Sequence, residues 1–517
     1  MSSAGLLRNP LSSHRGRALR TIATAVLIAA ASGLAMGACT SESDPGIELT
    51  GEGDPLYELV DASGVSISQI SVYQGVKILV MENGLPAPAG VPIVAGRDAL
   101  MRLWLNADPA VYNGQPLLVR LHISGFDKPI EIIAPVPGVP VEDNLQSTFN
   151  IQIPGSAITP GFSYRIEMLQ PRGQSKGANP AARYPAEGYS PTNTVSVGNT
   201  LRVTIVPIRY NADGSGRLPD TSEATIQGYR DYFHSMYAAP SVELTVREPI
   251  DYNKSVGAFG NGWDTLLAQI GQVRANDQAP FDAYYYGIFA PAKSINQYCS
   301  QGCVAGLGNI AGVNDPYARA AIGLGFEGDS VASWETAVHE VGHNHGRFHA
   351  PCGGAGGPDS KFPYSGGATG VWGYDLVQQR LFPPQSKDVM GYCYPIWVSD
   401  YTYNAFLERI QAVNAVVGTQ QKQLYPQDLL GRTYDRALID GDGNLTWVDS
   451  VTLELPPESN PVEVTVDAGE GPETLTGNFY EYDHLPGGVF LWPQPHGAPA
   501  RAVTLPWKGA LKSFTRD

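Results

Sequence analysis

Residues 339–349 read HEVGHNHGRFH and hold four of the nine histidines in a chain of 517 residues. If this segment is helical, His339 and His343 lie one turn apart on the same face, so their ring nitrogens can converge on one ion. Glu340 follows the first histidine and would lie beside such an ion, within reach of a water molecule. The segment therefore predicts a helix that carries two metal ligands and a general base.

A third ligand must come from a chain that turns back after this helix. Gly346 can adopt the left-handed backbone conformation that such a turn needs, and His349 follows three residues later. Three neutral imidazoles with an open fourth position are typical of a catalytic zinc site, whereas a structural zinc site closes that position with a protein ligand. We therefore predict one catalytic Zn²⁺ ion bound by His339, His343 and His349. Unrelated core histidines are the alternative.

Two neighbouring residues are not assigned to the ion. His345 lies off the face shared by His339 and His343, and we expect it to be partly exposed. Glu335 stands one turn before His339, where a solvated helix face is expected. Orientation of a ligand through a hydrogen bond is the alternative for this carboxylate.

The five fixed positions from His339 to His349 resemble the signature of the metzincin clan of zinc metallopeptidases. That clan has a methionine in a tight turn beneath the metal, and the resemblance assigns this structural role to Met390. Tyr392 stands two residues later, where some metzincin families have a tyrosine that binds the metal reversibly or stabilises an oxyanion. The resemblance thus implies Glu340 and Tyr392 as catalytic residues and Gly346 as the structural glycine of the turn.

A narrower resemblance covers roughly residues 330–405. The segments HAPCGG, DSKFPYSGGATGVWGYDL and KDVMGYCYPIWVSDYTY are similar to the StcE-type secreted mucinases. This resemblance implies a zinc metalloendopeptidase that hydrolyses peptide bonds in extracellular proteins, O-glycosylated ones among them. The expected partner is accordingly a protein or glycoprotein substrate.

Two other functions remain open. One is a surface adhesin that binds glycoproteins through β domains and carries an inactive protease core. The intact Glu340 and ligand histidines argue against it, because a degenerate core would have lost one of them. The other is a zinc amidase acting on peptidoglycan or another non-protein amide, a class that seldom has the Gly346 and His349 extension.

Four of the five cysteines lie in the body of the chain, at 299, 303, 352 and 393. An even number in an exported chain predicts two disulfides with three possible connectivities, and a cysteine-rich zinc site is a weaker alternative. In the metzincin fold the segments after His349 and Met390 meet beneath the zinc. The resemblance therefore implies a Cys352–Cys393 bridge and leaves Cys299–Cys303 as a small local loop.

The N-terminal segment predicts the compartment. Residues 1–38 have an arginine-bearing start and a long apolar run, which is the layout of an export signal peptide. MGAC at 36–39 resembles a bacterial lipobox, so we expect lipidation at Cys39, attachment to the outer leaflet of a membrane, and a surface lipoprotein or a secreted protein. Ordinary cleavage near Ala38, with Cys39 as a free thiol, is the alternative. Residues 39–55 are polar and read as a tether.

Charge and strand patterns complete the prediction of a multidomain chain. The net charge is −16 and no basic tract follows the N-terminal segment, which argues against nucleic-acid binding. Short alternating strands at 56–198 predict a β-sandwich, mixed strands and helices at 199–420 predict an α/β metzincin-like zinc metallopeptidase domain, and strand signals return at 421–517 as a small C-terminal β domain. DGDGN at 440–444 is similar to a calcium loop, but Leu445 replaces the required glycine and favours a hairpin turn.

Overall fold

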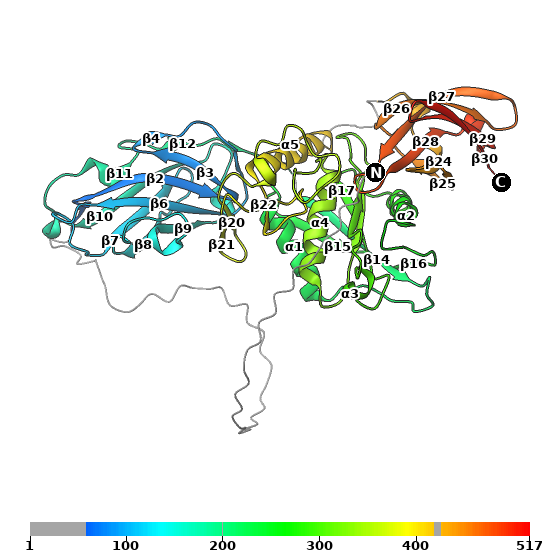
Figure 1. The fold of residues 1–517 in the computed structure, drawn as a ribbon. Coiled ribbons are helices and arrows are strands. Elements are labelled where there is room, and N and C mark those ends of the chain that lie inside the picture. The colour runs from blue at the N-terminus through cyan, green and yellow to red at the C-terminus, as the bar shows by residue number, and fades with distance from the viewer. Residues whose placement is uncertain (1–57, 199, 418–424, 517) are drawn as a thin grey trace, which may run out of the picture.

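The computed structural model describes residues 58–198, 200–417 and 425–516, which form three parts in chain order (Figure 1). The predicted export signal, the lipidation site Cys39 and the tether at 39–55 lie outside the described residues, so these expectations stay predictions. Within the described ranges, no helix is both long and apolar enough to cross a bilayer.

The first part consists mainly of two sheets that face one another. The first sheet has the order β1 (Leu59–Asp61), β10 (Ser163–Pro171), β7 (Leu117–Ile123) and β8 (Ile130–Ala134), and β11 (Arg183–Tyr184) and β12 (Ser190–Pro191) also pair with β10. The second contains β3 (Gly75–Glu82), β2 (Val65–Tyr73), β6 (Ala99–Ala107) and β9 (Phe149–Ile153), with β4 (Leu85–Pro86) on β3. A two-stranded parallel pair, β5 (Ile93–Val94) and β13 (Thr194–Val195), lies beside them.

Alternation along these strands explains the two-layer arrangement. Successive side chains of a strand point to opposite faces, so each sheet presents one apolar face that must be covered. Val72 and Leu103 from one sheet and Val119 and Ile166 from the other belong to one buried cluster.

A hairpin from much later in the chain extends the second sheet. β20 (Gly373–Asp375) pairs with β3, and β21 (Arg380–Phe382) pairs with β20. Two further short strands, β22 (Lys387–Asp388) and β23 (Ile396–Trp397), pair with one another. The indole N–H of Trp397 donates to the Gly75 carbonyl at 2.8 Å and so helps to fix the attachment of the hairpin. The region that follows the histidine-rich helix is thereby joined to the N-terminal sheets.

The central part is a mostly parallel sheet with helices on both faces. Its order is β15 (Val242–Val246), β14 (Leu201–Tyr210), β17 (Ala283–Phe289), β19 (Ala320–Leu324) and β18 (Gly306–Gly308), with β16 (Ile250–Tyr252) also on β14. β18 is antiparallel to β19 and forms an edge of the sheet. The helices are α1 (Glu223–Met236), α2 (Trp263–Asn276), the short α3 (Ile295–Tyr298), α4 (Ser330–Asn344) and α5 (Asp400–Val417).

The strand β17 shows how this sheet is covered. Tyr284 and Tyr286 share a buried cluster with residues of α1 and α4, whereas Tyr285 between them shares a different cluster with residues of α2. The histidine-rich helix α4 therefore lies on one face of the sheet, and α2 lies on the other.

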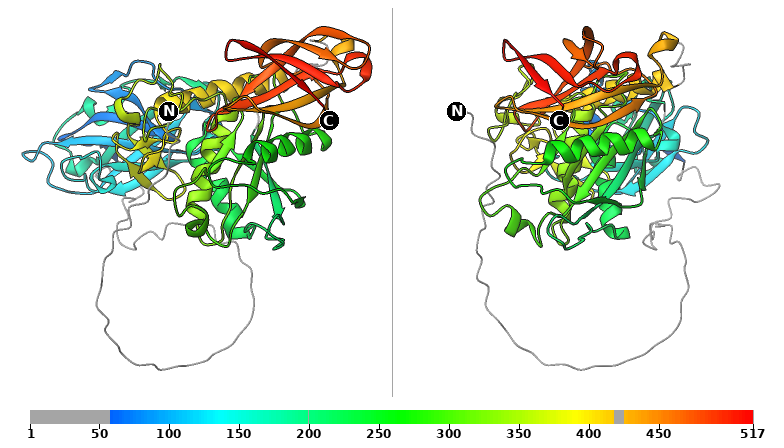
Figure 2. Two further views of the ribbon diagram at one scale, coloured as in Figure 1. Left: turned by 45° about the vertical axis from the view of Figure 1, so that its right-hand side comes forward. Right: turned by 90° about the vertical axis from the view of Figure 1, so that its right-hand side faces the viewer.

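The third part is a seven-stranded antiparallel sheet that packs on α2 (Figure 2). Its order is β25 (Leu445–Leu453), β24 (Arg432–Asp440), β28 (Gly487–Pro493), β27 (Pro472–Glu481), β26 (Asn460–Asp467), β29 (Ala502–Trp507) and β30 (Ala510–Thr515). Leu438 and Leu491 share one buried cluster with Leu266 of α2. The DGDGN segment is the turn that joins β24 to β25, as the sequence predicts.

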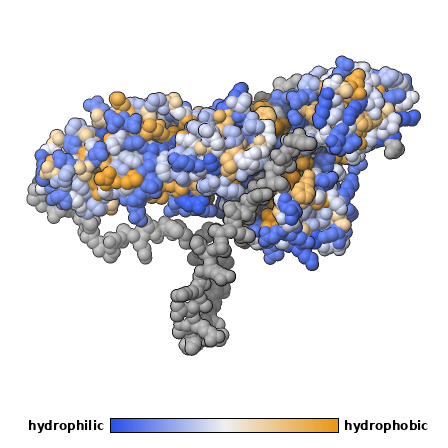
Figure 3. Space-filling view, viewed as in Figure 1, coloured by the Kyte–Doolittle hydropathy of each residue, from blue (hydrophilic) through white to orange (hydrophobic). Residues whose placement is uncertain are grey.

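The molecule is thus multidomain and rich in strands, as expected. Hydrophilic residues cover much of all three parts on the face drawn in Figure 3, and apolar residues occur there as separate patches.

Candidate metal centre

The helix α4 places two of the predicted ligands and the predicted base in the interior. His339, Glu340 and His343 are 7%, 1% and 0% exposed, respectively. The helix ends at Asn344, and Gly346 follows with a φ of 77°. The left-handed conformation at Gly346 favours glycine, and a side chain there would also displace the guanidinium of Arg409.

Backbone carbonyls fix the orientation of all three imidazoles. The Nδ1 atoms of His339, His343 and His349 lie 2.6, 2.7 and 2.6 Å from the carbonyl oxygens of Val389, Arg347 and Gly356, respectively. A carbonyl can only accept, so each Nδ1 carries the proton and each Nε2 presents a lone pair. Metal-binding histidines are usually oriented by hydrogen bonds of this kind.

The three lone pairs converge. His339 Nε2 and His343 Nε2 are 3.1 Å apart. Two ligands of a tetrahedral zinc at the usual bond length are about 3.3 Å apart, so the spacing suits a small cation between them. Burial, with nearby imidazoles, lowers the pKa of His339 well below its usual value and that of His349 to about 3, which keeps both rings neutral. These residues could hold a metal ion.

Met390 lies directly behind the ligand helix. It is 1% exposed, and a side-chain carbon added to Gly342 would approach its sulfur to 2.5 Å. The Met390 carbonyl also accepts a hydrogen bond from the Ala350 N–H at 2.9 Å. This segment therefore supports both α4 and the chain that carries His349. No sequence pattern indicates this close approach between position 342 and Met390.

Tyr392 reaches the centre from the same segment. Its hydroxyl lies 3.1 Å from His349 Nε2 and also contacts His484 Nδ1. Burial, followed by the charges of Asp483 and Glu340, raises the pKa of Tyr392 well above its usual value. The phenol is therefore a hydrogen-bond donor at neutral pH.

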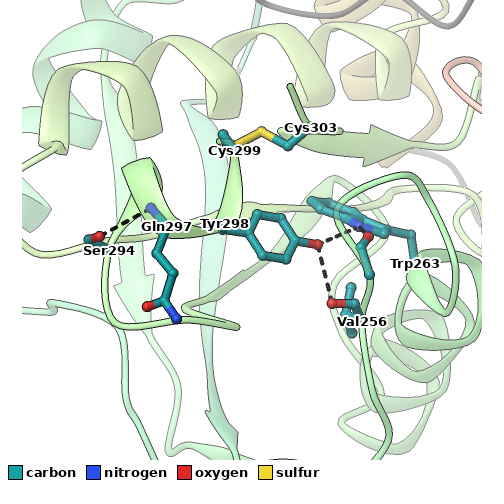
Figure 4. The surroundings of a disulfide bond; sticks show 8 residues. Val256, Trp263, Ser294, Gln297, Tyr298, Cys299 and Cys303 are labelled. Carbon is teal, nitrogen blue, oxygen red and sulfur yellow. Dashed lines mark hydrogen bonds between the residues drawn. A yellow bond between two sulfur atoms is a disulfide. The ribbon is translucent and has the colours of Figure 1, made fainter. Parts of the chain in front are cut away.

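Both predicted disulfide pairs are confirmed. Cys352 and Cys393 are 5.8 Å apart between Cα atoms and tie the chain after His349 to the chain after Met390. Cys299 and Cys303 close a short loop after α3, next to Tyr298, whose hydroxyl accepts the indole N–H of Trp263 at 3.2 Å (Figure 4). Disulfides indicate an exported or extracellular protein.

Two further residues of the candidate centre could not be predicted from the sequence. Asp483 and His484 lie in the turn between β27 and β28 and enter the centre from the C-terminal sheet. Their ligand atoms and those of the three predicted histidines all lie within 4.8 Å of one another. His484 is 144 residues from Glu340. No local spacing pattern could have connected residues so far apart.

In this turn the imidazole of His484 lies between two carboxylates, those of Glu340 and Asp483. His484 Nε2 lies 2.9 Å from a Glu340 oxygen and 3.0 Å from an Asp483 oxygen. Burial alone would lower the pKa of His484, but the two carboxylates raise it to about 9. Burial raises the pKa of Glu340, and the charge of His484 opposes this shift. Burial also acts to raise the pKa of Asp483, but His484 and His343 hold it below its usual value.

A pocket opens beside Glu340. Its lining includes the apolar side chains of Val304 and Ile396, the ring of Tyr394 and the carboxylate of Glu335. Burial raises the pKa of Glu335 to about 7. This carboxylate faces a pocket next to the metal centre, rather than the solvated helix face expected from the sequence.

The prediction for His345 was wrong. This residue is 2% exposed, and its ring stacks on Tyr284 with centroids 4.3 Å apart. Its Nδ1 bonds the Val341 carbonyl at 2.8 Å, and burial lowers its pKa to about 3. The helix ends in the interior against the sheet, so a residue off the ligand face meets another buried surface and not solvent.

No family model matches this chain, and no curated protein matches it either.

Proposed function

We propose that this protein is a zinc-dependent metalloendopeptidase with a metzincin-like catalytic domain. The observation that carries the proposal is the orientation of the three histidines. Each is fixed by a carbonyl at Nδ1 and directs Nε2 to one point, and Glu340 lies beside that point on the same helix. Three imidazoles with an adjacent carboxylate suit hydrolysis better than purely structural metal binding.

A zinc ion, when bound, would supply Lewis-acid polarisation of the substrate carbonyl and of the attacking water. Glu340 takes a proton from that water and passes it to the nitrogen of the leaving amine. Its Oε2 atom is buried and makes no hydrogen bond within the described residues, so it is available as an acceptor. Tyr392 donates a hydrogen bond to the oxyanion that develops on the carbonyl.

The surroundings of Glu340 offer places for substrate on either side of the scissile bond. The edge strand β18 can pair with an extended polypeptide, and the pocket lined by Val304, Ile396 and Glu335 can take one of its side chains. We propose extracellular proteins as the substrate class, O-glycosylated ones among them. The enzyme would act as an exported protein, secreted or held at a bacterial surface through a lipid on Cys39.

The experiment compares purified wild-type protein with Glu340→Ala on a panel of proteins with and without O-glycans. New N-termini are sequenced and zinc content is measured. We expect cleavage by the wild type and a loss of at least 10²- to 10⁴-fold, roughly the contribution of a general base, in the variant at unchanged zinc content. A variant that cleaves at the wild-type rate would contradict the mechanism. Equal binding of glycoproteins by both proteins without cleavage would support the adhesin alternative.

A further inference from the structure

The turn between β27 and β28 enters the metal centre from the C-terminal sheet. Asp483 Oδ2 lies 2.9 Å from His343 Nε2, and the Asp483 side chain is 1% exposed. This oxygen is buried and receives no well-aligned hydrogen bond from any described residue. Because His343 Nδ1 donates to the Arg347 carbonyl, the neutral ring of His343 presents a lone pair at Nε2. With His343 neutral, its Nε2 and Asp483 Oδ2 are two acceptors at a distance that suits a shared cation, and His484 Nε2 lies 3.0 Å from the same oxygen.

The same turn also occupies the edge of the central sheet. Tyr482 forms an antiparallel bridge with Asn309, the residue that follows β18. Asp483 Oδ1 accepts the Gly308 N–H at 3.3 Å. A sheet edge is where an added extended chain obtains its main-chain hydrogen bonds. The turn thus lies where a polypeptide bound along β18 would have to pass.

The C-terminal sheet holds this turn from a firmly packed base. Arg436 of β24 donates from Nη1 to the Ala268 carbonyl of α2 at 2.8 Å and is 2% exposed. Tyr480 of β27 donates to the carboxylate of Asp315, which is fully buried. Tyr480 and Tyr482 belong to the same buried cluster as residues of α2. The position of Asp483 is therefore set by the packed interface that immediately precedes it in the chain.

We infer that Asp483 is a fourth metal ligand and that the segment 482–484, here called the inserted turn, occupies the substrate position. The carboxylate closes the fourth position that a catalytic site must leave open. His484 at the same time pairs with Glu340, the proposed base. The C-terminal sheet would thus hold the site of most molecules in a closed, inactive state. The assignment of Asp483 as a ligand stands without the proposed function, whereas the substrate position and the inactivity of the closed state rest on it.

The test uses full-length protein loaded with Co²⁺, whose visible absorption reports ligand number, and acetohydroxamate as a small chelating probe. Asp483→Ala is compared with wild type and with Glu481→Ala, an exposed charge two residues earlier on β27. Wild type should show a four-coordinate spectrum that changes in Asp483→Ala. A site open in only about 1–10% of molecules binds its ligand about 10- to 100-fold more weakly, so Asp483→Ala should bind acetohydroxamate more tightly by that factor. Glu481→Ala should match the wild type.

Asp483→Asn retains the shape and the acceptor for Gly308 and serves if the alanine variant does not fold. Its affinity for acetohydroxamate should also exceed that of the wild type. Equal affinities and identical Co²⁺ spectra in wild type, Asp483→Asn and any folded Asp483→Ala protein would overturn the inference.

Peptidase assays on the same proteins separate this inference from the proposed function. We expect cleavage to increase in Asp483→Ala by the factor seen for acetohydroxamate. Tighter probe binding without cleavage of any protein would uphold the ligand assignment and contradict the peptidase proposal. Cleavage by the wild type with no change in either readout in Asp483→Ala would contradict the inference alone.

Discussion

Two segments meet at the candidate metal centre, and they reach it by different physical means. The segment 339–349 brings three imidazoles and Glu340 together through helix periodicity and one left-handed turn at Gly346. The inserted turn brings Asp483 and His484 through the packing of a separate sheet on α2. Ligands of the first kind are encoded locally, whereas those of the second depend on a docked interface.

The comparison also separates two kinds of contribution. The histidines of the first segment have their Nδ1 atoms fixed by backbone carbonyls close to them in space. Asp483 has no backbone partner at Oδ2, which lies beside the side chains of His343 and His484, whereas its Oδ1 accepts the Gly308 N–H. We therefore expect the first segment to determine whether metal binds, and the inserted turn to determine whether the bound metal is accessible.

The largest expected difference between the two segments is in metal content. His343→Ala should lose zinc. Losing a hydrogen-bond partner of a ligand lowers metal affinity roughly 10- to 100-fold, and losing the ligand itself should lower it further. Asp483→Ala should retain zinc, since three imidazoles remain. Metal analysis after dialysis against a weak chelator measures both. Zinc retained after replacement of His339, His343 and His349 together would refute the site itself.

The next effect concerns the support of His349. Replacing Cys352 and Cys393 by alanine removes a bridge across 41 residues, which is worth about 4 kcal/mol in the chain-entropy account. The matched control, Cys299→Ala with Cys303→Ala, opens a bridge across 4 residues and should cost about 2 kcal/mol. Denaturant unfolding of both variants measures the difference. A larger decrease in the free energy of unfolding in the control would contradict a supporting role for the longer bridge.

Tyr392 contacts both segments, so its role is best measured with the inserted turn released. In an Asp483→Ala background, Tyr392→Phe should reduce kcat roughly tenfold to a few hundredfold, because one oxyanion donor is removed. Zinc content should not change. If kcat is unaffected in that background, the hydroxyl serves only the contact with His484.

The smallest effect is expected at Glu335, one turn before His339. Burial raises the pKa of the Glu335 carboxyl to about 7. The folded state therefore binds this proton more tightly than the unfolded state does. The associated stability is fully present below pH ~4.5, the unfolded pKa, and is lost as the pH rises through about 7. Glu335→Gln should therefore be more stable than wild type at pH 8 by about 1 to 2 kcal/mol after allowance for solvent screening.

The difference between Glu335→Gln and wild type should vanish near pH 4. Unfolding by denaturant at both pH values, with the two proteins treated identically, measures it. An equal difference at pH 4 and pH 8 would show that the carboxylate does not titrate in this range.

Much of the architecture follows from sequence patterns. The mixed strands and helices expected at 199–420 correspond to the central sheet with its helices, and the alternating strands expected at 56–198 form facing sheets. The pairing of β20 with β3 could not be predicted from the sequence, because a strand of three residues is too short to show an alternating pattern. The burial of His345 did not follow either, because it depends on what packs against the end of α4.

The sequence by itself determined the three imidazoles, Glu340 and the turn at Gly346, because helix geometry and glycine conformation relate residues a few positions apart. Only the tertiary structure decided that Asp483 and His484 join them. Their approach depends on the docking of one sheet against α2 in a buried cluster that contains Leu438 and Leu266, and on the sheet edge after β18, where Tyr482 bridges Asn309. Contacts between elements so distant in the chain are set by the complementarity of whole surfaces, which no short spacing pattern records.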